Sequence, residues 1–417
     1  MKNWKIVLGI LTANVVMMAA GYTMLIPFLP MYLIKELGVS MEAVKLWNGA
    51  IFSITFLIGG IMAPIWGKLA DTKGKKMMAM RAGAGLALSY YLGGVVTSPE
   101  QMFCVRVLQG FAAGLWSVCL AIATSLVPLE KLGVSLGVLQ AGLTCGNVIG
   151  PLLGGSLATL FGMRMSFFVA GSLLTLITII FYFYIPEPNQ LQQGEEQNEQ
   201  NEQNEQAGAR RQSLLTEAAP ETEGPLWKQP LIREALLYVA IAQMVILLIQ
   251  PILTLYVGEL TQGEGNLLFL SGMVFSLVGI ASALTAPSWG RFGQKHGFYS
   301  SLCFASLSAG LMNFFVALPN TLLYFGVANF VYGLCTAGIQ PSLSAILASN
   351  TNANQRGRVF GFMFSAQQFG SMVGPLVGGA IATFFPLRAL FIVAAFILLG
   401  ISVAVWRKHL GAKSRLA

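Results

Sequence analysis

The feature that most constrains this sequence is a series of apolar stretches, each roughly 20 residues or longer, that recurs along its whole length. As a helix, one such stretch spans about 30 Å of hydrocarbon. Charged residues make up only 10% of the 417 residues, whereas a soluble domain carries about 25%. A soluble protein with a large core would need charged helix faces, and these stretches offer none. The sequence therefore predicts an all-α membrane protein with twelve transmembrane helices.

The predicted spans form two sets of six. The first set lies at about 6–31, 47–69, 77–96, 100–126, 133–158 and 163–185, and the second at about 232–257, 266–289, 298–317, 320–347, 357–383 and 387–406. These sets give an N-terminal six-helix bundle at 1–185 and a C-terminal six-helix bundle at 231–406, followed by a cytoplasmic tail at 407–417. We expect the two bundles to be pseudo-symmetric.

The segment at 186–230 differs in composition from both sets. It contains QLQQGEEQNEQNEQNEQAGARRQ, a low-complexity tract of glutamine, glutamate and asparagine with no apolar side chains to bury. This composition predicts a flexible cytoplasmic linker that leaves the two bundles free to move relative to each other.

Lysine and arginine are unevenly distributed between the two sides that twelve spans create. Lys35, Lys45, Arg164 and Arg388 fall on one side, Arg106 lies within a span, and the other 20 of the 25 basic residues fall on the side of the termini. Because cytoplasmic loops are enriched in lysine and arginine, both termini are predicted to be cytoplasmic. The expected location is a bacterial plasma (inner) membrane, crossed many times.

Residue types that build catalytic or metal sites are scarce. The five cysteines lie inside apolar stretches at spacings that fit neither a disulfide framework nor a zinc site. The two histidines, His296 and His409, lie in basic hydrophilic segments. We therefore expect no enzyme, no metal and no cofactor. Basic residues spread over short loops argue against a nucleic-acid partner, and the lack of an output domain disfavours a membrane sensor or scaffold.

The two halves also resemble each other in sequence. APIWGKLADTKG at 63–74 aligns with APSWGRFGQKHG at 286–297, an offset of 223 residues. GNVIGPLLGGSLATLFGMR at 146–164 aligns with GSMVGPLVGGAIATFFPLR at 370–388, an offset of 224 residues. Both copies have the same predicted orientation, so the repeat is parallel. A parallel repeat of six spans with a cavity between the halves is typical of transporters, although a duplicated scaffold without transport would give the same pattern.

The loop between spans 2 and 3 reads GKLADTKGKK at 67–76. It must turn tightly, which Gly67 and Gly74 permit, and Asp71 can lie at the positive N-terminus of a neighbouring helix. Asp71 is the only aspartate in the sequence, and its counterpart in the second half is Gln294. An ordinary basic loop would satisfy the positive-inside rule without these glycines or Asp71.

This loop is similar to the signature loop of the major facilitator superfamily, in which Lys75 and Lys76 complete the motif. The resemblance covers the whole chain apart from the linker. It implies that the helix next to Asp71 is span 11, with Arg358 near its start, and that Lys75 pairs with Glu130 at the cytoplasmic end of span 4. Such contacts would hold the cytoplasmic side closed and would break when the cavity opens inward.

Span 4 contains RVLQG at 106–110, which resembles the conserved-arginine motif of the same family. An arginine within a span is costly and usually functional. Two interpretations remain open. In the first, Arg106 lines the cavity or takes part in proton movement; in the second, it reaches the outer interface or binds backbone carbonyls. Its counterpart in the repeat is Asn329.

Span 5 contains GNVIGPLLGG, which is similar to the motif of the drug–proton antiporter branch. Proline removes a backbone hydrogen bond and bends the helix, and the glycines permit close approach of another helix. Packing accounts for these residues fully, so only the resemblance connects the motif with export. The predicted helix-bend residues are Gly146, Gly150, Pro151, Gly154, Gly155, Gly374 and Pro375.

A narrower resemblance is carried by IPFLPMYL in span 1, FSITFL in span 2 and QPILTLYVGEL in span 7, which look like MdtG-like multidrug efflux proteins. In the superfamily, spans 1, 4, 7 and 10 line the cavity. There this sequence offers amides, aromatic rings and methionines, a mixture that suits amphipathic compounds better than sugars. The candidate cavity and coupling residues are Asn14, Tyr22, Arg106, Gln109, Trp116, Gln243, Gln250, Tyr256, Asn329, Tyr332, Gln340 and Gln367.

The predicted function is proton-coupled efflux of amphipathic small molecules by alternating access, with the proton gradient as the energy source. The expected partners are a small-molecule substrate, protons and the lipid bilayer, and the protein is expected to be monomeric. Many proton-coupled relatives carry a carboxylate within a span, whereas every glutamate here lies in a loop, in the linker or at a span end. The lone cation Arg106 keeps an alternative open, a dedicated exporter of an anionic metabolite such as a carboxylate siderophore.

Overall fold

The computed structural model describes residues 4–127, 129–185, 229–262, 265–351 and 355–410. Most of the predicted linker and the end of the predicted tail lie outside these residues. The described chain is helical. The N-terminal bundle contains α1 (Trp4–Met24), α2 (Leu29–Lys35), α3 (Ala43–Lys73), α4 (Lys75–Val95), α5 (Pro99–Ala112), α6 (Leu115–Leu126), α7 (Leu129–Phe161) and α8 (Met163–Tyr184). The C-terminal bundle contains α10 (Pro230–Ile249), η2 (Gln250–Ile252), α11 (Leu253–Thr261), α12 (Leu267–His296), α13 (Phe298–Ala317), α14 (Leu322–Thr336), α15 (Ile339–Ser349), α16 (Arg356–Phe384), α17 (Arg388–Val405) and η4 (Trp406–Leu410).

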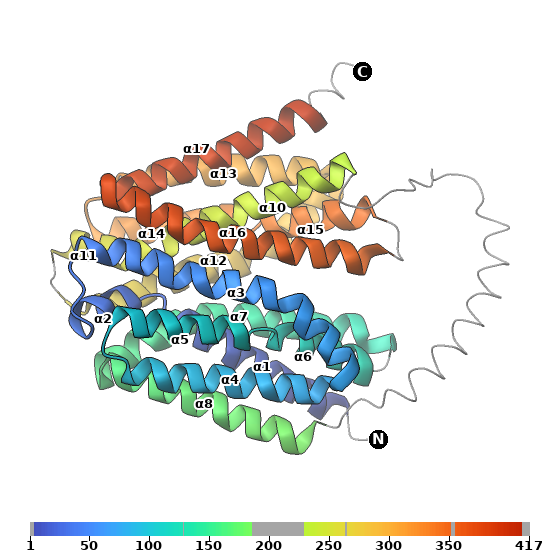
Figure 1. The fold of residues 1–417 in the computed structure, drawn as a ribbon. Helices are drawn as coiled ribbons and strands as arrows, with labels where there is room; N and C mark the ends of the chain where they lie inside the picture. The colour runs from blue at the N-terminus through green and yellow to red at the C-terminus, as the bar shows by residue number, and fades with distance from the viewer. Residues whose placement is uncertain (1–3, 128, 186–228, 263–264, 352–354, 411–417) are drawn as a thin grey trace, which may run out of the picture.

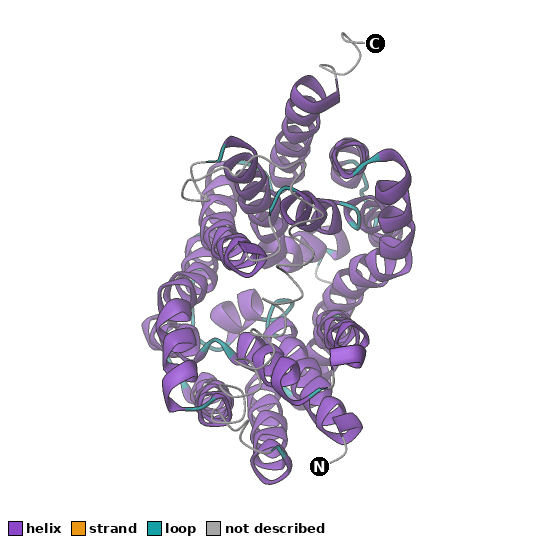
Figure 2. Ribbon diagram, turned by 90° about the vertical axis from the view of Figure 1, so that its right-hand side faces the viewer, coloured by secondary structure: helices purple, strands orange, loops and turns teal. Residues whose placement is uncertain are grey.

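The two bundles lie side by side with their helices roughly along one direction (Figure 1), and the turned view shows them as two groups of helices (Figure 2). We call the end where α1 begins and α17 ends the terminal face, and the other end the opposite face. In each bundle the first helix packs on the fifth predicted span, α1 on α7 and α10 on α16. Across the seam, α3 packs on α16 and α12 packs on α7.

Ten segments of the described chain are long and apolar enough to cross a membrane. The remaining two predicted spans, α4 and α16, are less apolar because they carry basic residues, glycines and amides, yet they pack along the bundles beside α8 and α10. All twelve predicted spans are therefore present as helices.

Each of spans 1, 4, 7 and 10 is broken into two α-helices, with η2 between the two in span 7, and the hydropathy pattern did not predict these breaks. Pro27, Gly114 and Pro251 lie at three of these breaks, and Gly114 adopts a φ of 112° that favours glycine. At two of them an indole donor satisfies a carbonyl that the break leaves free, because Trp66 Nε1 donates to Phe111 O over 2.9 Å and Trp289 Nε1 donates to Leu334 O over 2.8 Å. The two indoles are repeat counterparts.

The predicted loop at 67–76 is much shorter in the structure. Gly67 lies within α3, which continues to Lys73, and Gly74 alone makes the turn, with a φ of 98°. Its repeat counterpart Gly297 makes the same turn with a φ of 92°. The boundary was wrong because polarity marks where a helix leaves the apolar layer, whereas the helix itself ends at a glycine with positive φ.

The cores are arranged differently at the two ends. Toward the opposite face, one continuous core joins both bundles and contains Phe28 and Leu33 together with Ile252 and Tyr256. Toward the terminal face, each bundle has its own separate core. The bundles thus share buried apolar surface at one end only, among the described residues.

Candidate functional site

Arg106 lies at the centre of a buried polar cluster in the N-terminal bundle. Its side chain is 1% exposed, so it does not reach the surface. Its Nη1 donates to Gln109 Oε1 over 2.9 Å, and Gln109 Nε2 donates to the hydroxyl of Tyr90 over 3.5 Å. The guanidinium also lies over the ring of Phe52, 5.3 Å from its centroid. The cluster joins α3, α4 and α5.

The charge of Arg106 has no ionic partner among the described residues, where the two ion pairs are Arg164–Glu36 and Lys408–Glu234. Its Nη2 and the nearby hydroxyl of Tyr22 are buried and make no hydrogen bond with another described residue. A buried, uncompensated cation is costly in an apolar layer. Tyr90 completes the cluster although the sequence analysis did not select it, because α4 was not expected to line the cavity.

Three predicted glutamines meet in the C-terminal bundle. Gln340 of α15 donates from Nε2 to Gln243 Oε1 of α10 over 3.4 Å, and Gln367 of α16 donates from Nε2 to Gln340 Oε1 over 3.5 Å. All three side chains are half-buried. The structure therefore connects three residues that the sequence analysis proposed one by one. We call them the glutamine chain.

The other predicted cavity residues are placed as follows. Asn14 is buried with an unpartnered Oδ1, and Asn329 donates to Phe325 O of its own helix over 2.9 Å. Trp116 packs against the terminal-face core of the N-terminal bundle. Tyr332 packs against both the shared core and the terminal-face core of the C-terminal bundle, and Gln250 is the half-buried first residue of η2. Tyr256 is 1% exposed, with its ring 5.0 Å from that of Phe325 and 5.2 Å from that of Phe391. Its side chain fills the shared core and lines no open space in this conformation.

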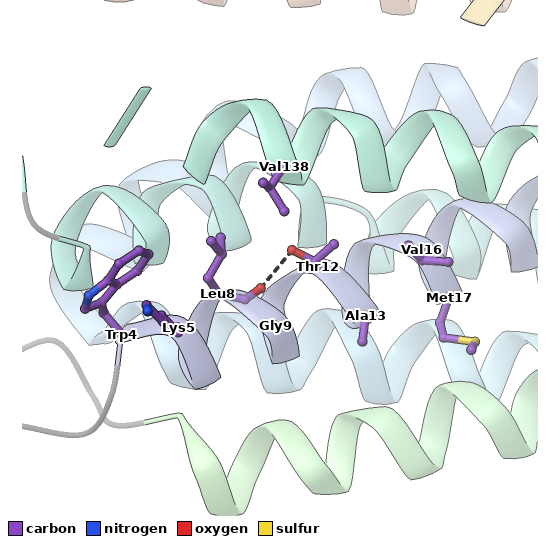
Figure 3. Close-up of a pocket in the computed structure, with 9 residues that line it drawn as sticks. All are labelled: Trp4, Lys5, Leu8, Gly9, Thr12, Ala13, Val16, Met17 and Val138. Carbon is purple, nitrogen blue, oxygen red and sulfur yellow. Dashed lines mark hydrogen bonds between the residues drawn. The ribbon is translucent and has the colours of Figure 1, made fainter. Parts of the chain in front are cut away.

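An open hollow of about 650 Å³ lies along the terminal half of α1 (Figure 3). It is mainly apolar and carries one cation, Lys5. Two adjacent rows of α1 line it, together with Val138 of α7. The lining residues are Trp4, Lys5, Leu8, Gly9, Thr12, Ala13, Val16, Met17 and Val138. The sequence analysis missed this surface, although the i, i+4 spacing of its rows is visible in the sequence.

The signature-loop residues are only partly described. Lys75 Nζ donates to Ser125 Oγ of α6 over 2.6 Å, and Lys76 lies over the ring of Tyr182 at 5.0 Å. Glu130 belongs to the first turn of α7 rather than to the end of span 4. The side chains of Asp71 and Glu130 lie outside the described residues, and Arg358 is exposed. The contacts of Asp71 with span 11 and of Lys75 with Glu130 remain predictions.

The predicted helix-bend motif has two faces. A Cβ atom at Gly146 would lie 2.5 Å from the carbonyl oxygen of Val16, and Gly150 and Gly154 likewise face the backbone of α1. In α16, a Cβ at Gly374 would lie 2.6 Å from Met244 O of α10. These glycines fit helices together within each bundle.

The last glycine of each motif faces the other bundle. A Cβ at Gly379 would lie 2.6 Å from Lys45 O of α3, and one at Gly155 would overlap Leu268 O of α12. The facing helices α3 and α12 also place a glycine in this contact. A Cβ at Gly49 would lie 2.5 Å from Pro375 O, and one at Gly272 would overlap Pro151 O. These contacts form two repeat-related pairs. We call Gly49, Gly155, Gly272 and Gly379 the seam glycines.

Hydrogen bonds between the bundles lie in the same region. Lys45 Nζ donates to Ala382 O over 2.8 Å, Thr254 Oγ1 donates to Pro27 O over 2.7 Å, and Ser276 Oγ donates to Val148 O over 2.6 Å. Asn48 also donates to Pro251 O. All of these residues lie in the halves of their spans nearer the opposite face.

The same four helices are parted near the terminal face. In each of them one glycine near this face is in open space, because a Cβ added to it would meet nothing within 4 Å. These residues are Gly67, Gly137, Gly290 and Gly361. Close contact at one end of the seam and open space at the other show that this conformation is closed at the opposite face and open at the terminal face.

Two bundles related by a parallel repeat, with polar side chains at membrane depth beside a seam that is open at one end, define a polytopic membrane transporter. A family model described as Major Facilitator Superfamily matches residues 11–282 and 267–415. The chain belongs to the major facilitator superfamily. It is thus a multi-pass inner-membrane protein that transports a small molecule.

Two related sequences and one solved structure are similar to this chain over nearly its whole length. The chain is 32% identical over 405 residues to the multidrug resistance protein MdtG of Citrobacter koseri, covering 97% of this chain and 95% of that protein. It is also 32% identical over 388 residues to the uncharacterized MFS-type transporter YuxJ of Bacillus subtilis, covering 93% and 94%. A solved bacterial homologue of the human lysosomal transporter Spinster, in an inward-facing and occupied conformation, has a TM-score of 0.79 at 13% identity over 98% of this chain and 97% of that one.

Proposed function

We propose that this protein expels amphipathic small molecules from the bacterial cytoplasm in exchange for protons, by alternating access. The observation that carries the proposal is the seam, where the bundles share a core and interlocking glycines at the opposite face and stand apart at the terminal face. We propose that both termini are cytoplasmic, as the distribution of lysine and arginine predicts. The open terminal face then faces the cytoplasm, and this conformation takes up substrate from there. Similarity to MdtG over nearly the whole chain supports a multidrug substrate range.

Among the described residues, no carboxylate lies in the middle of a membrane-crossing segment, where it could carry the proton. Glutamates such as Glu36, Glu234 and Glu259 lie at helix ends. We therefore propose that coupling uses either an interfacial acid, such as Asp71 or Glu259, or the Arg106 cluster together with water. The cluster fits this role because its buried donors are not fully satisfied and because it joins three helices of one bundle.

Efflux from proteoliposomes tests the proposal. Purified protein is reconstituted into liposomes. The proteoliposomes are loaded with amphipathic cationic and neutral dyes, and dye efflux is measured with and without a pH gradient. We expect dye efflux that accelerates with the gradient. Efflux that ignores the gradient under every condition would show that proton antiport is wrong.

Arg106 supports a second candidate, a dedicated exporter of one anionic metabolite. A buried guanidinium without a carboxylate partner could be neutralised by the acid group of a substrate. The same vesicles loaded with organic carboxylates distinguish the two functions. Export of one carboxylate with no dye efflux would favour this candidate over the first.

A further inference from the structure

The glutamine chain contains more hydrogen-bonding capacity than the protein uses. A primary amide offers two donors and an acceptor oxygen with two lone pairs. Gln243, Gln340 and Gln367 are joined only by two hydrogen bonds, of 3.4 and 3.5 Å. Amides are costly in an apolar layer unless they bind something. These three are half-buried, so part of each remains open to a ligand.

Bundle architecture does not require these amides. In the repeat, Gln243, Gln340 and Gln367 correspond to Ala19, Ser117 and Leu143 of the N-terminal bundle. That bundle packs the equivalent helices together without any amide at these positions. The glutamine chain is therefore an addition specific to the C-terminal bundle, which points to a ligand rather than to folding.

The three helices that carry the glutamine chain have no charged residue near it. The charged residues of α10 and α16 lie within the first five residues of each helix, and α15 has none. Gln368, the neighbour of Gln367, contacts the other bundle, since a Cβ at Gly59 would lie 3.4 Å from its Nε2. The glutamine chain thus lies next to the seam, where alternating access changes what is exposed.

We propose that the glutamine chain binds the uncharged cis-amide edge of substrates, the adjacent N–H and C=O of a lactam, an imide or a pyrimidine base. An amide presents a donor and an acceptor side by side, and a cis-amide edge presents the complementary pair, so the two form paired hydrogen bonds. This inference rests on the proposed function and names a substrate class for it. It assigns recognition of neutral polar groups to the C-terminal bundle.

A matched pair of probes tests the proposal. 1,8-Naphthalimide has an imide N–H between two carbonyls, and N-methyl-1,8-naphthalimide lacks only that donor; both are neutral and fluorescent. Binding of each is titrated against the purified full-length protein in detergent. We expect the N–H imide to bind roughly 3- to 10-fold more tightly than its N-methyl partner, the value of one good hydrogen bond.

Variants locate the effect. Gln340→Met, which keeps the length of the side chain, should reduce the affinity ratio to about 1, while retained binding of the N-methyl imide shows that the variant is folded. Gln243→Met and Gln367→Met should each lower the ratio partly. The control is Gln368→Met, on the same helix but outside the chain, which should keep the wild-type ratio.

Equal binding of the two imides to the wild-type protein would overturn the inference, as would a ratio that survives in Gln340→Met or the binding of neither probe. Dye efflux is measured separately. A protein that expels dye yet does not distinguish the imides would keep its proposed function and lose this substrate class.

Discussion

Two arginines of the N-terminal bundle are held in contrasting ways. Arg81 donates to Phe111 O over 2.9 Å and to Ala113 O over 3.0 Å, and its guanidinium lies 3.8 Å from the ring centroid of Trp66. It thereby satisfies carbonyls freed by the break between α5 and α6. Arg106 is fully buried with one side-chain acceptor, Gln109. Arg81 stabilises the fold. Arg106 lowers its stability, because a buried charge without an ionic partner is unfavourable, so we infer that Arg106 serves transport.

Replacing each arginine by methionine should therefore have opposite effects. Arg106→Met removes a buried, uncompensated charge, so Tm should stay within about 2 °C of the wild type or rise, while efflux falls roughly tenfold or more. Arg81→Met, the control, loses two charge-assisted hydrogen bonds and should lower Tm by roughly 3 °C or more. Thermal unfolding in detergent and proteoliposome efflux measure both. A large fall in Tm for Arg106→Met would mean that its role is structural.

Sequence reasoning at this scale identified polar residues but not their partners. Arg106 and Gln109 are one helical turn apart, so their contact follows from the sequence. Tyr90 comes from another helix, and only the packing of α4 on α5 brings it to Gln109. Tyr256 shows the converse. Its span was expected to line the cavity, but its ring packs in an aromatic core between Phe325 and Phe391.

Among the elements, the four seam helices show how one motif performs two tasks. Gly378 lies against α10 of its own bundle, where a Cβ would overlap Leu248 O. Gly379, the next residue, lies against α3 of the other bundle. The repeat predicted both glycines, but it could not say which face serves the fold and which serves closure. That distinction depends on helix rotation, which a hydropathy pattern with several small residues on both faces does not determine.

Alanine at these adjacent positions should separate folding from closure. Gly378→Ala forces overlap inside the C-terminal bundle and should destabilise it, lowering Tm. Gly379→Ala should leave each bundle intact and weaken closure of the opposite face. The reporter is Met17→Cys, which lines the hollow of α1, in a background without the five native cysteines. We expect membrane-impermeant maleimide, added outside intact cells, to label the reporter several-fold faster in Gly379→Ala than in the parent.

In Gly378→Ala the external labelling rate should stay at the parental value. If Gly379→Ala instead lowered Tm as Gly378→Ala does and left labelling unchanged, the seam glycines would serve only general packing.

For the whole molecule, the sequence predicted two six-helix bundles correctly. Each apolar span and each copy of the repeat is recognised from its own stretch of sequence, without knowledge of the packing. The sequence did not predict the conformation. Which end of the seam is closed depends on the balance between two sets of interbundle contacts, the seam glycines at one end and the region of Gly67 and Gly361 at the other. Such a balance between packed states is a property of the assembled bundles.

Alternating access is the central claim, and two distances measured together test it most directly. Spin labels are placed near the terminal face at Thr72→Cys and Arg358→Cys, and near the opposite face at Glu42→Cys and Phe384→Cys. All four residues are exposed, and each pair joins one end of α3, with Glu42 as its N-cap, to one end of α16. The distances are measured by pulsed electron–electron double resonance at two pH values, with and without a transported dye. The account predicts that the terminal pair moves closer as the opposite pair moves apart. Distances that never change, or that lengthen and shorten together, would contradict it.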